Sequence, residues 1–423
     1  MRHVILGNGP AGVIAAETIR KHARRDEIVL VGSEPEPPYS RMALPYLMIG
    51  KIGEQGTYLR KDPGHFDKLN IHLRRARAKR VSPSNRSVTF DDGIELEFDR
   101  LLVATGSVPV RPPIPGIDLP GVHPCWTLED ARHIMALAKP GARVLQMGAG
   151  FIGCIIMEAL AARGVQLSIV EMGDRMVPRM MGATAGGMIK RWVERKGVAV
   201  YCSARVETIV PGGVASPLEV RLSGGRRIPA DLVISATGVK PNIDFLRGAG
   251  IECRTGVVTD ARMMSHVPGI YAAGDVAEAY DAITDTRIVS AIQPNAADQA
   301  TCAGLNMVGK VAQLPAVTYI NVLDTMGLIS CSFGQWHGLP GGSHVELADE
   351  PNFKLLRLEF HGDLMVGANA VGYTQHVGVL RGLVEGRVKL GEWKEKLLRD
   401  PMRVPEAYLA CAQGQDSWLR KAA

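Results

Sequence analysis

Apolar and polar positions follow the same order in two separate segments of the chain. In the first, apolar runs over residues 2–6 and 27–32 flank a glycine-rich turn and a stretch, 13–19, with apolar positions at helical spacing. Short apolar runs between turns predict buried strands, and the periodic stretch predicts a helix. The first segment is therefore expected to fold as strand, turn, helix and strand.

The second segment begins at residue 142. Apolar runs over 142–147 and 166–170 flank another glycine-rich turn, and residues 157–160 belong to the helical stretch between them. Strands that alternate with helices predict parallel sheets of the α/β class. The 423 residues exceed what one hydrophobic core supports, so two or three domains are expected.

Both turns carry the pattern G-x-G-x-x-G directly after a strand. Glycines permit a tight turn there and let a pyrophosphate approach the start of the helix. The helix dipole at that end favours negative charge by roughly 0.3–1 kcal/mol. The residues expected to line the two nucleotide sites are Gly7, Gly9, Pro10, Ala11 and Gly12 in the first and Gly148, Gly150, Ile152 and Gly153 in the second.

A carboxylate closes each unit about 20 residues past its glycines, at Glu34 and at Glu171. A carboxylate at this place accepts ribose hydroxyls and repels a 2′-phosphate, so the second site favours NADH over NADPH. Arg175 is the nearest basic residue after Glu171 and keeps NADPH as the less favoured alternative. Two complete units predict two bound dinucleotides, and hence electron transfer between two carriers.

Three further segments end in short motifs at the close of apolar runs. Residues 101–106 and 234–238 end in Ala-Thr-Gly, and residues 269–275 end in Gly-Asp. Together with the glycine turns, these motifs resemble the FAD- and NAD(P)-dependent pyridine nucleotide-disulfide oxidoreductases that hold two dinucleotides. That family includes NADH oxidases, CoA-disulfide reductases, the flavin part of nitrite reductases, and the reductases of rubredoxin and ferredoxin. The resemblance covers essentially the whole chain.

The resemblance implies an α/β fold with two Rossmann-like three-layer dinucleotide-binding domains, one inserted in the other, plus an α+β C-terminal interface domain. The FAD-binding domain would comprise residues 1–112 and 246–316. The NAD(H)-binding domain would comprise 113–245, and the C-terminal dimerisation domain 317–423. A homodimer is the family expectation.

Local patterns in the last part of the chain agree with this layout. Residues 321–327 and 354–360 are expected to be strands, and residues 376–385 are expected to be helical.

The resemblance also assigns cofactor-binding residues. Asp275 would bond the ribityl chain of FAD, and Arg41 of the Tyr39-Ser40-Arg41 motif would bind its pyrophosphate. A helix expected at about 295–305 would point its positive N-terminus at the flavin. The remaining cofactor-binding positions are Ala78, Thr105, Gly106, Gly274 and Gly238.

The chain departs from the family at positions that carry redox chemistry. Met42 stands where disulfide reductases and NADH oxidases have a reactive cysteine, and a thioether cannot form a thiolate. Pro10 stands where NADH peroxidases carry a histidine. Disulfide reduction and peroxide reduction by a cysteine are therefore not expected.

A second departure concerns the Lys–Glu pair of rubredoxin and ferredoxin reductases. Tyr46 and Ile155 take these two places and would flank the flavin and nicotinamide site. Both charges are absent together, so no buried partner is left unpaired. No certain catalytic residue is expected, because hydride transfer requires only that nicotinamide stacks on the flavin.

The net charge, the cysteine spacing and the apolar runs exclude other classes of protein. The net charge of +6 is too small to indicate nucleic-acid binding in so long a chain, yet it suits an acidic redox partner. The most basic stretch, 74–80, is interpreted as one strand with solvated side chains. The seven cysteines lack zinc or iron–sulfur spacing, so no metal is expected and a reducing, cytoplasmic compartment is indicated. No apolar run is long enough to span a membrane, and no signal peptide precedes the first strand.

Three functions remain open. The first hypothesis is electron transfer from NADH through FAD to an external redox protein, namely ferredoxin, rubredoxin or a nitrite-reductase-like partner subunit. The second is reduction of a small molecule such as CoA disulfide, a quinone or O2. The third is a redox-sensing binding module that resembles apoptosis-inducing-factor-type flavoproteins and turns over slowly.

Overall fold

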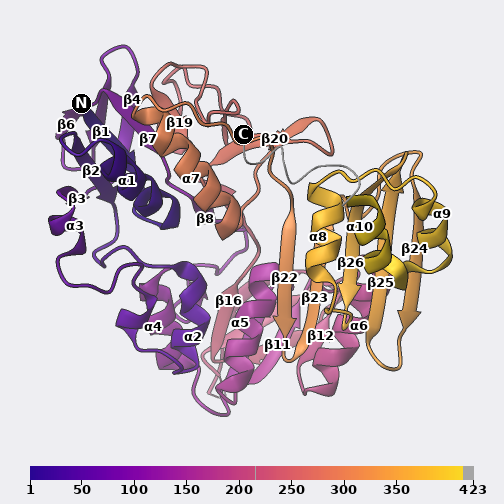
Figure 1. Cartoon of the computed structure of the whole chain (residues 1–423). Coiled ribbons are helices and arrows are strands. Elements are labelled where there is room, and N and C mark those ends of the chain that lie inside the picture. Colours follow the sequence, from indigo (N-terminus) through magenta and orange to yellow (C-terminus); the bar gives the residue numbers. More distant parts are fainter. Residues whose placement is uncertain (215, 413–423) are drawn as a thin grey trace. The chain divides into compact units, whose positions relative to one another are not determined.

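The computed structural model describes residues 1–214 and 216–412 and confirms the α/β class (Figure 1). Two compact units can be distinguished. One comprises Met1–Val108 and Val239–Val317, and the other comprises Pro109–Gly238 and the chain from Thr318 onward. The first unit is therefore assembled from two stretches of sequence that are far apart.

The three-domain layout expected from the family, with an FAD-binding domain made of two segments, stays a prediction. Both the expected NAD(H)-binding segment and the expected C-terminal domain fall largely in the second unit. Residues 413–423 of the expected C-terminal domain lie outside the described residues.

The first unit is built on a parallel five-stranded sheet with the order β19-β7-β1-β2-β3. Its central strands are almost entirely buried, as their apolar runs predicted. Helices α1 (Pro10–His22) and α7 (Gln293–Met307) pack against each other, and Gly304 permits their close approach. The strands are β1 (Arg2–Leu6), β2 (Glu27–Gly32), β3 (Ile71–Arg75), β7 (Arg100–Val103) and β19 (Ile270–Ala272).

Two small sheets extend the first unit. One is antiparallel and the other is mixed. They consist of β4 (Ala78–Ser82), β5 (Ser87–Phe90) and β6 (Glu95–Glu97), and of β18 (Val257–Val258), β20 (Ala277–Asp281) and β21 (Thr286–Ile288).

The basic stretch 74–80 is not one strand, so that prediction was wrong. The stretch contains the end of β3 and the start of β4, which belong to different sheets. Ala76 between them is buried, and its N–H donates to the carbonyl of Gly32 over 2.9 Å. The chain turns at this buried contact, while most of the basic side chains on either side are exposed.

The second unit repeats the same plan. Its parallel sheet has the order β12-β11-β10-β16-β9, and an antiparallel sheet β13-β14-β15 accompanies it. The edge strand β9 precedes the glycine turn in sequence, whereas β19 of the first unit comes long after its turn. The strands are β9 (Val122–Pro124), β10 (Arg143–Met147), β11 (Gln166–Val170), β12 (Ala199–Tyr201), β13 (Val206–Pro211), β14 (Leu218–Leu222), β15 (Arg227–Ala230) and β16 (Leu232–Ser235).

The helices of this plan begin at the glycine turns, as expected for a pyrophosphate site at a helix N-terminus. Helix α5 (Phe151–Ala162) follows Gly150 directly, just as α1 follows Gly9. Both glycines are N-caps with extended backbone, so the helix starts inside the glycine motif. Helices α4 (Leu128–Leu137) and α6 (Ala183–Arg195) complete this part.

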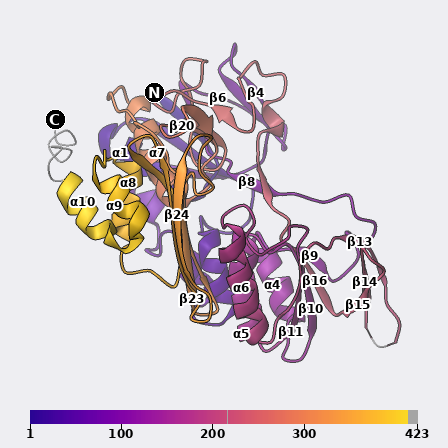
Figure 2. The ribbon, with the colours of Figure 1, turned by 90° about the vertical axis from the view of Figure 1, so that its right-hand side faces the viewer.

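The C-terminal part of the second unit is an antiparallel sheet with the order β22-β23-β26-β25-β24. Figure 2 shows this sheet on edge, with α8, α9 and α10 on one side and α6 on the other. The two predicted strands and the predicted helix are present as β22, β25 and α8. The elements are β22 (Ile320–Thr325), β23 (Leu328–Gly334), β24 (Ser343–Asp349), β25 (Lys354–His361), β26 (Leu364–Val371), α8 (Val377–Glu385), α9 (Trp393–Arg399) and α10 (Val404–Ala412).

Two short strands lie where the chain leaves the first unit and where it returns to it. β8 (Ser107–Pro109) leads out of the first stretch of sequence and β17 (Val239–Pro241) leads back, and the two strands pair with each other. Backbone bonds extend the pairing, with Asn242 N–H donating to Gly106 O and Val110 N–H to Gly238 O, each over 2.9 Å. The outgoing and returning chain segments therefore lie side by side.

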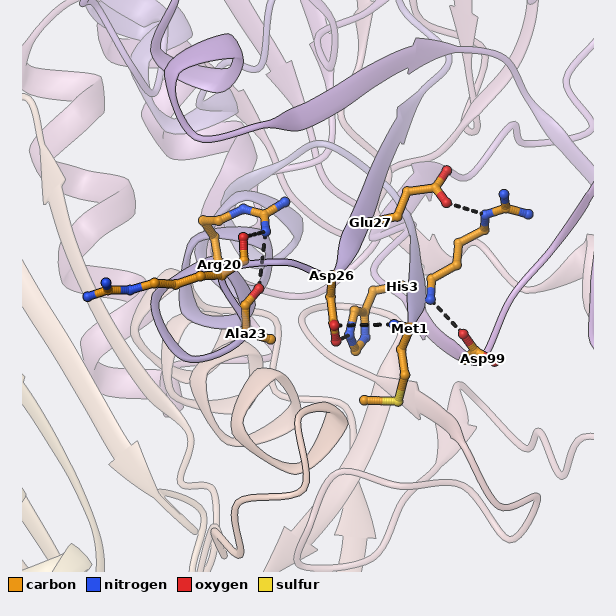
Figure 3. A network of polar contacts seen from close by, with 9 residues as sticks. Met1, His3, Arg20, Ala23, Asp26, Glu27 and Asp99 are labelled. Carbon is orange, nitrogen blue, oxygen red and sulfur yellow. Dashed lines mark hydrogen bonds and ion pairs between the residues drawn. The ribbon is translucent and has the colours of Figure 1, made fainter.

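A polar network closes the amino-terminal ends of β1 and β2, away from the glycine turn (Figure 3). The ring of His3 is fully buried, and its Nε2 lies 2.8 Å from Oδ2 of Asp26. The other carboxylate oxygen of Asp26 lies 3.2 Å from the Met1 amino group. Burial lowers the pKa of His3, although the bond to Asp26 and its charge act in the opposite direction.

No helix within the described ranges combines the length and hydrophobicity that a membrane crossing requires. All seven cysteines lie in the described part of the chain, and none forms a disulfide.

Candidate functional site

The first glycine turn has no space for side chains at two of its three glycines. A Cβ on Gly7, which has φ +112°, would lie 2.0 Å from the carbonyl oxygen of Ala104. A Cβ on Gly12 would lie 1.8 Å from the oxygen of Gly7. A Cβ on Gly9 would meet nothing within 4 Å. Since Gly9 caps α1, this open space is where a pyrophosphate could approach the helix N-terminus.

The second glycine turn has the same geometry. Cβ atoms on Gly148 and Gly153 would lie 2.4 Å from Ala236 O and 2.6 Å from Gly148 O, whereas one on Gly150 would meet nothing within 4 Å. Ile152 follows in the first turn of α5. The turn therefore offers a second open approach to a helix N-terminus.

A buried glutamine supports the second turn, which the sequence did not predict. The side-chain Nε2 of Gln146 donates to Gly148 O over 2.9 Å and to Gly153 O over 3.0 Å. Gln146 lies two residues before the first glycine, where the first unit has Ile5. In the second unit, a side-chain amide thus links the strand, the glycine turn and the helix, whereas the apolar Ile5 of the first unit cannot form such bonds.

Glu34 and Arg41 come together in the first unit. Arg41 Nη2 donates to the Glu34 carboxylate over 2.7 Å, and its Nη1 bonds the Tyr39 hydroxyl over 2.7 Å. The Tyr39 hydroxyl also donates to Glu34. Both predicted cofactor residues therefore belong to one network at the end of β2.

Glu171 is held against the second glycine turn. Its carboxylate accepts from the backbone N–H of Ala149 over 2.7 Å and from that of Gly173 over 2.8 Å. In the described part of the chain, no hydrogen bond or ion pair joins Arg175 to Glu171. Arg175 Nε donates to Met181 O over 2.9 Å, and its Nη1 lies 2.7 Å from Asp174.

Asp275 lies in the Gly-Asp motif after β19, and its carboxylate accepts from Ser107 Oγ over 2.8 Å. Burial raises the pKa of Asp275, while Ser107 and the charge of Arg41 act in the opposite direction. Gly274, at φ +82°, donates from its N–H to Oε1 of the buried Gln299 over 2.7 Å. The motif is therefore fixed to α7, whose observed start at Gln293 agrees with the predicted helix.

The remaining predicted positions lie in both units. Thr105 donates from its hydroxyl to Asn242 O over 2.8 Å, and Gly106 takes a positive φ of +63°. Ala78 is partly buried and packs against the hydrophobic core of the first unit. In the second unit, a Cβ on Gly238 would lie 3.9 Å from Nη1 of Arg179, an exposed side chain that the sequence did not single out.

Met42 and Tyr46 are both solvent-exposed, each at 53%. They lie in the short helices Arg41–Ala43 and α2 (Leu44–Met48) of the first unit. Ile155 lies on α5 of the second unit and is half-buried. The structure thus places the two halves of the expected flavin–nicotinamide contact in different units.

The thiols of the described residues are not activated. Burial raises the pKa of Cys125, Cys154 and Cys331 to about 12. The described residues also contain no group of three or more His, Cys, Asp or Glu side chains that could hold a metal ion.

The residues present fit two dinucleotides. Each turn leaves its middle glycine open to a ligand at a helix N-terminus, and each has a carboxylate at the end of the adjacent strand. These are the contacts that a pyrophosphate and a ribose require.

Comparison with known proteins agrees with this geometry. Residues 1–301 match the family described as pyridine nucleotide-disulphide oxidoreductase. The chain is 29% identical over 406 residues to the epsilon subunit of the NADH-dependent phenylglyoxylate dehydrogenase of Aromatoleum evansii, with 95% of this chain and 96% of that protein covered.

Two further relatives share about a third of their aligned residues with this chain. An NADH oxidase of Methanocaldococcus jannaschii is 33% identical over 324 residues, covering 74% of this chain and 71% of that protein. The ferredoxin–NAD(+) reductase component of the biphenyl dioxygenase system of Paraburkholderia xenovorans is 33% identical over 279 residues, covering 64% and 66%.

A solved structure shows the same fold over nearly the full length. The covalent complex of putidaredoxin reductase with putidaredoxin matches with a TM-score of 0.88 and 22% identity, covering 97% of this chain and 99% of the matched chain. The chain therefore belongs to the pyridine nucleotide-disulphide oxidoreductase family, as a flavin-dependent oxidoreductase whose cofactors are FAD and NAD(P)H.

Proposed function

We propose that the protein transfers electrons between NADH and a separate redox protein by way of FAD. FAD supplies the chemistry that joins a two-electron hydride donor to a one-electron carrier. The observation that carries the proposal is the absence of an activated thiol: Met42 occupies the cysteine position, and burial raises the pKa of the thiols. Electrons must therefore leave from the flavin itself.

The second unit would bind NADH. The open side of Gly150 would admit the pyrophosphate, and the Glu171 carboxylate, fixed by Ala149 N–H, would accept the ribose hydroxyls. Arg179 beside Gly238 would add a positive charge near the phosphates. A 2′-phosphate would meet the negative charge of Glu171, which supports NADH over NADPH.

The first unit would bind FAD. The pyrophosphate would be surrounded by the first glycine turn, namely Gly7, Gly9, Pro10, Ala11 and Gly12. When Glu34 bonds a ribose hydroxyl, the Arg41 guanidinium would bind the negatively charged pyrophosphate. Asp275, linked to Ser107, would bond the ribityl chain, and Ala78, Thr105, Gly106 and Gly274 would complete the site. Helix α7 would direct its N-terminus to the flavin ring.

The acceptor would be a ferredoxin, a rubredoxin or a nitrite-reductase-like partner subunit. The relatives support this choice, because one is a ferredoxin reductase component and a full-length match is one subunit of a larger dehydrogenase. The net charge of +6 suits an acidic carrier. We further propose a cytoplasmic homodimer, which size-exclusion chromatography with light scattering and cell fractionation would test.

Two anaerobic measurements test the proposal. Stopped-flow mixing with NADH should bleach the oxidised-flavin absorbance, and adding oxidised two-iron ferredoxin should restore it. O2 and CoA disulfide, tested in parallel, should reoxidise the flavin far more slowly. Persistence of the oxidised band with NADH would refute the proposal, as would faster turnover with O2 or CoA disulfide than with both ferredoxin and rubredoxin.

A further inference from the structure

The side-chain amide of Asn369 holds the loop after Glu171 from two sides. Asn369 lies in β26 and is fully buried. Its Nδ2 donates to Met180 O over 3.0 Å, and its Oδ1 accepts from Gly182 N–H over 3.1 Å. The peptide groups on either side of Met181 are thereby fixed by a residue of the C-terminal sheet, within the same unit.

Arg175 depends on the segment that Asn369 fixes. Its Nε donates to the carbonyl of Met181 over 2.9 Å, and Asp174 binds its Nη1 over 2.7 Å. The aliphatic part of Arg175 lies against Gly186 of α6, where a Cβ would come within 2.9 Å of Arg175 Cδ. The guanidinium group is thus held by Met181 O and Asp174.

Helix α6 is also fixed to the C-terminal sheet. Near its start, the Thr184 hydroxyl donates to Glu346 over 2.8 Å. Near its end, Trp192 Nε1 donates to Met326 O over 3.2 Å. Loop and helix are therefore both bonded to the C-terminal sheet, and Figure 2 shows α6 beside that sheet.

The position of Arg175 matters for the choice of dinucleotide. It is the first basic residue after Glu171, and a free guanidinium at that place binds a 2′-phosphate through paired hydrogen bonds. In the structure the Arg175 guanidinium is bonded to Met181 O and Asp174, whereas the Glu171 carboxylate accepts from Ala149 N–H of the second glycine turn.

We propose that Asn369 is a positioning residue for nucleotide specificity: by fixing Met180–Gly182 it keeps Arg175 bound to Met181 O and so maintains preference for NADH. The inference rests on the proposed NADH preference. It assigns to the C-terminal sheet an effect on a ribose site that it does not itself form.

The test compares kcat/KM for NADPH with kcat/KM for NADH in FAD-loaded protein. Asn369→Ala should raise this ratio about tenfold. Arg175→Ala alone should leave the ratio unchanged, and Asn369→Ala combined with Arg175→Ala should restore it to the starting value. Calorimetry with ADP and 2′,5′-ADP should show the same shift in affinity without turnover.

Arg191→Ala is the matched control. It removes an ion pair of 2.5 Å between α6 and Glu350 but touches neither Met181 nor Arg175, so the ratio should not change. FAD content and thermal midpoint show whether each variant is folded. If Asn369→Ala fails to fold, Asn369→Ser keeps one hydroxyl for the loop and should give a smaller rise.

Three results would overturn the inference: an unchanged ratio in folded Asn369 variants, an equal rise in the double variant, or a change caused by Arg175→Ala alone. A wild-type protein that prefers NADPH would instead refute the proposed NADH function. The two failures are therefore distinguishable.

Discussion

Arg60 binds both carboxylate oxygens of Glu17, with Nε 2.6 Å from Oε1 and Nη2 2.5 Å from Oε2. His65 Nε2 lies 2.8 Å from Oε1 of the same carboxylate. Glu17 is on α1, whereas Arg60 follows the segment that carries Tyr39, Arg41 and Tyr46. The pair therefore fastens the segment with the predicted FAD contacts to the helix that begins at the first glycine turn.

Glu17→Gln should lower the free energy of unfolding by about 1–3 kcal/mol, because it removes a paired charge and leaves Arg60 without its partner. Burial opposes ionisation of Glu17, but bonds from Arg60 and His65 outweigh it, and the pKa of Glu17 lies below its usual value. Its contribution is therefore present at neutral pH and is lost as the pH falls from about 4.5 toward that lower pKa.

Urea unfolding at several pH values measures this effect. The wild-type midpoint should fall with acidification more steeply than that of Glu17→Gln. Parallel curves for the two proteins would show that the pair does not contribute.

Gly9→Ala and Gly12→Ala should fail in different ways. A Cβ at Gly9 meets open space and its backbone φ of −74° suits alanine, so the protein should fold but retain less FAD. A Cβ at Gly12 would lie 1.8 Å from Gly7 O, so that variant should lose thermal stability or fail to fold. Flavin absorbance per protein and the thermal midpoint distinguish the two outcomes.

Gly150→Ala is the counterpart in the second unit. Its Cβ would also meet open space, so FAD content and the thermal midpoint should be unchanged while KM for NADH rises at least about tenfold, a cost of about 1.4 kcal/mol. Loss of FAD from this variant would contradict the assignment of the two turns.

Glu171→Gln should lower kcat/KM for NADH about tenfold, since a neutral amide is a weaker acceptor for ribose hydroxyls than a carboxylate. The kcat/KM for NADPH should not fall, because the repelling charge is gone. Steady-state rates with both nucleotides give the comparison, and equal losses would indicate a purely structural role in holding Ala149 and Gly173.

Electron transfer to ferredoxin should resist iodoacetamide at pH 7. Burial raises the pKa of all seven thiols, so very little thiolate is available. Met42→Cys supplies an exposed thiol as the control and should take up one alkyl group by mass spectrometry. Inactivation of the wild-type protein by the reagent would point to an unrecognised catalytic cysteine.

The sequence predicted those parts of the fold that depend on local geometry. The glycine turns were found because Gly7, Gly12, Gly148 and Gly153 stand where backbone atoms leave no room for a Cβ. The apolar runs gave the central strands because both faces of a parallel sheet are buried. The helices start at the glycine turns, where the sequence placed their N-termini.

Other contacts had no local signal. Gln146 supports the second glycine turn and Gln299 the Gly-Asp motif, each through one buried amide, and Asn369 reaches a loop 189 residues away. Such pairs follow from tertiary packing, which no periodicity records. The break in the basic stretch was missed for the same reason, because one buried alanine, Ala76, redirects the chain.

The pairing of β8 with β17 also bears on tolerance to insertions. A segment whose outgoing and returning strands pair with each other begins and ends at one place, so a change of length within residues 110–238 should leave the bond between Asn242 and Gly106 intact.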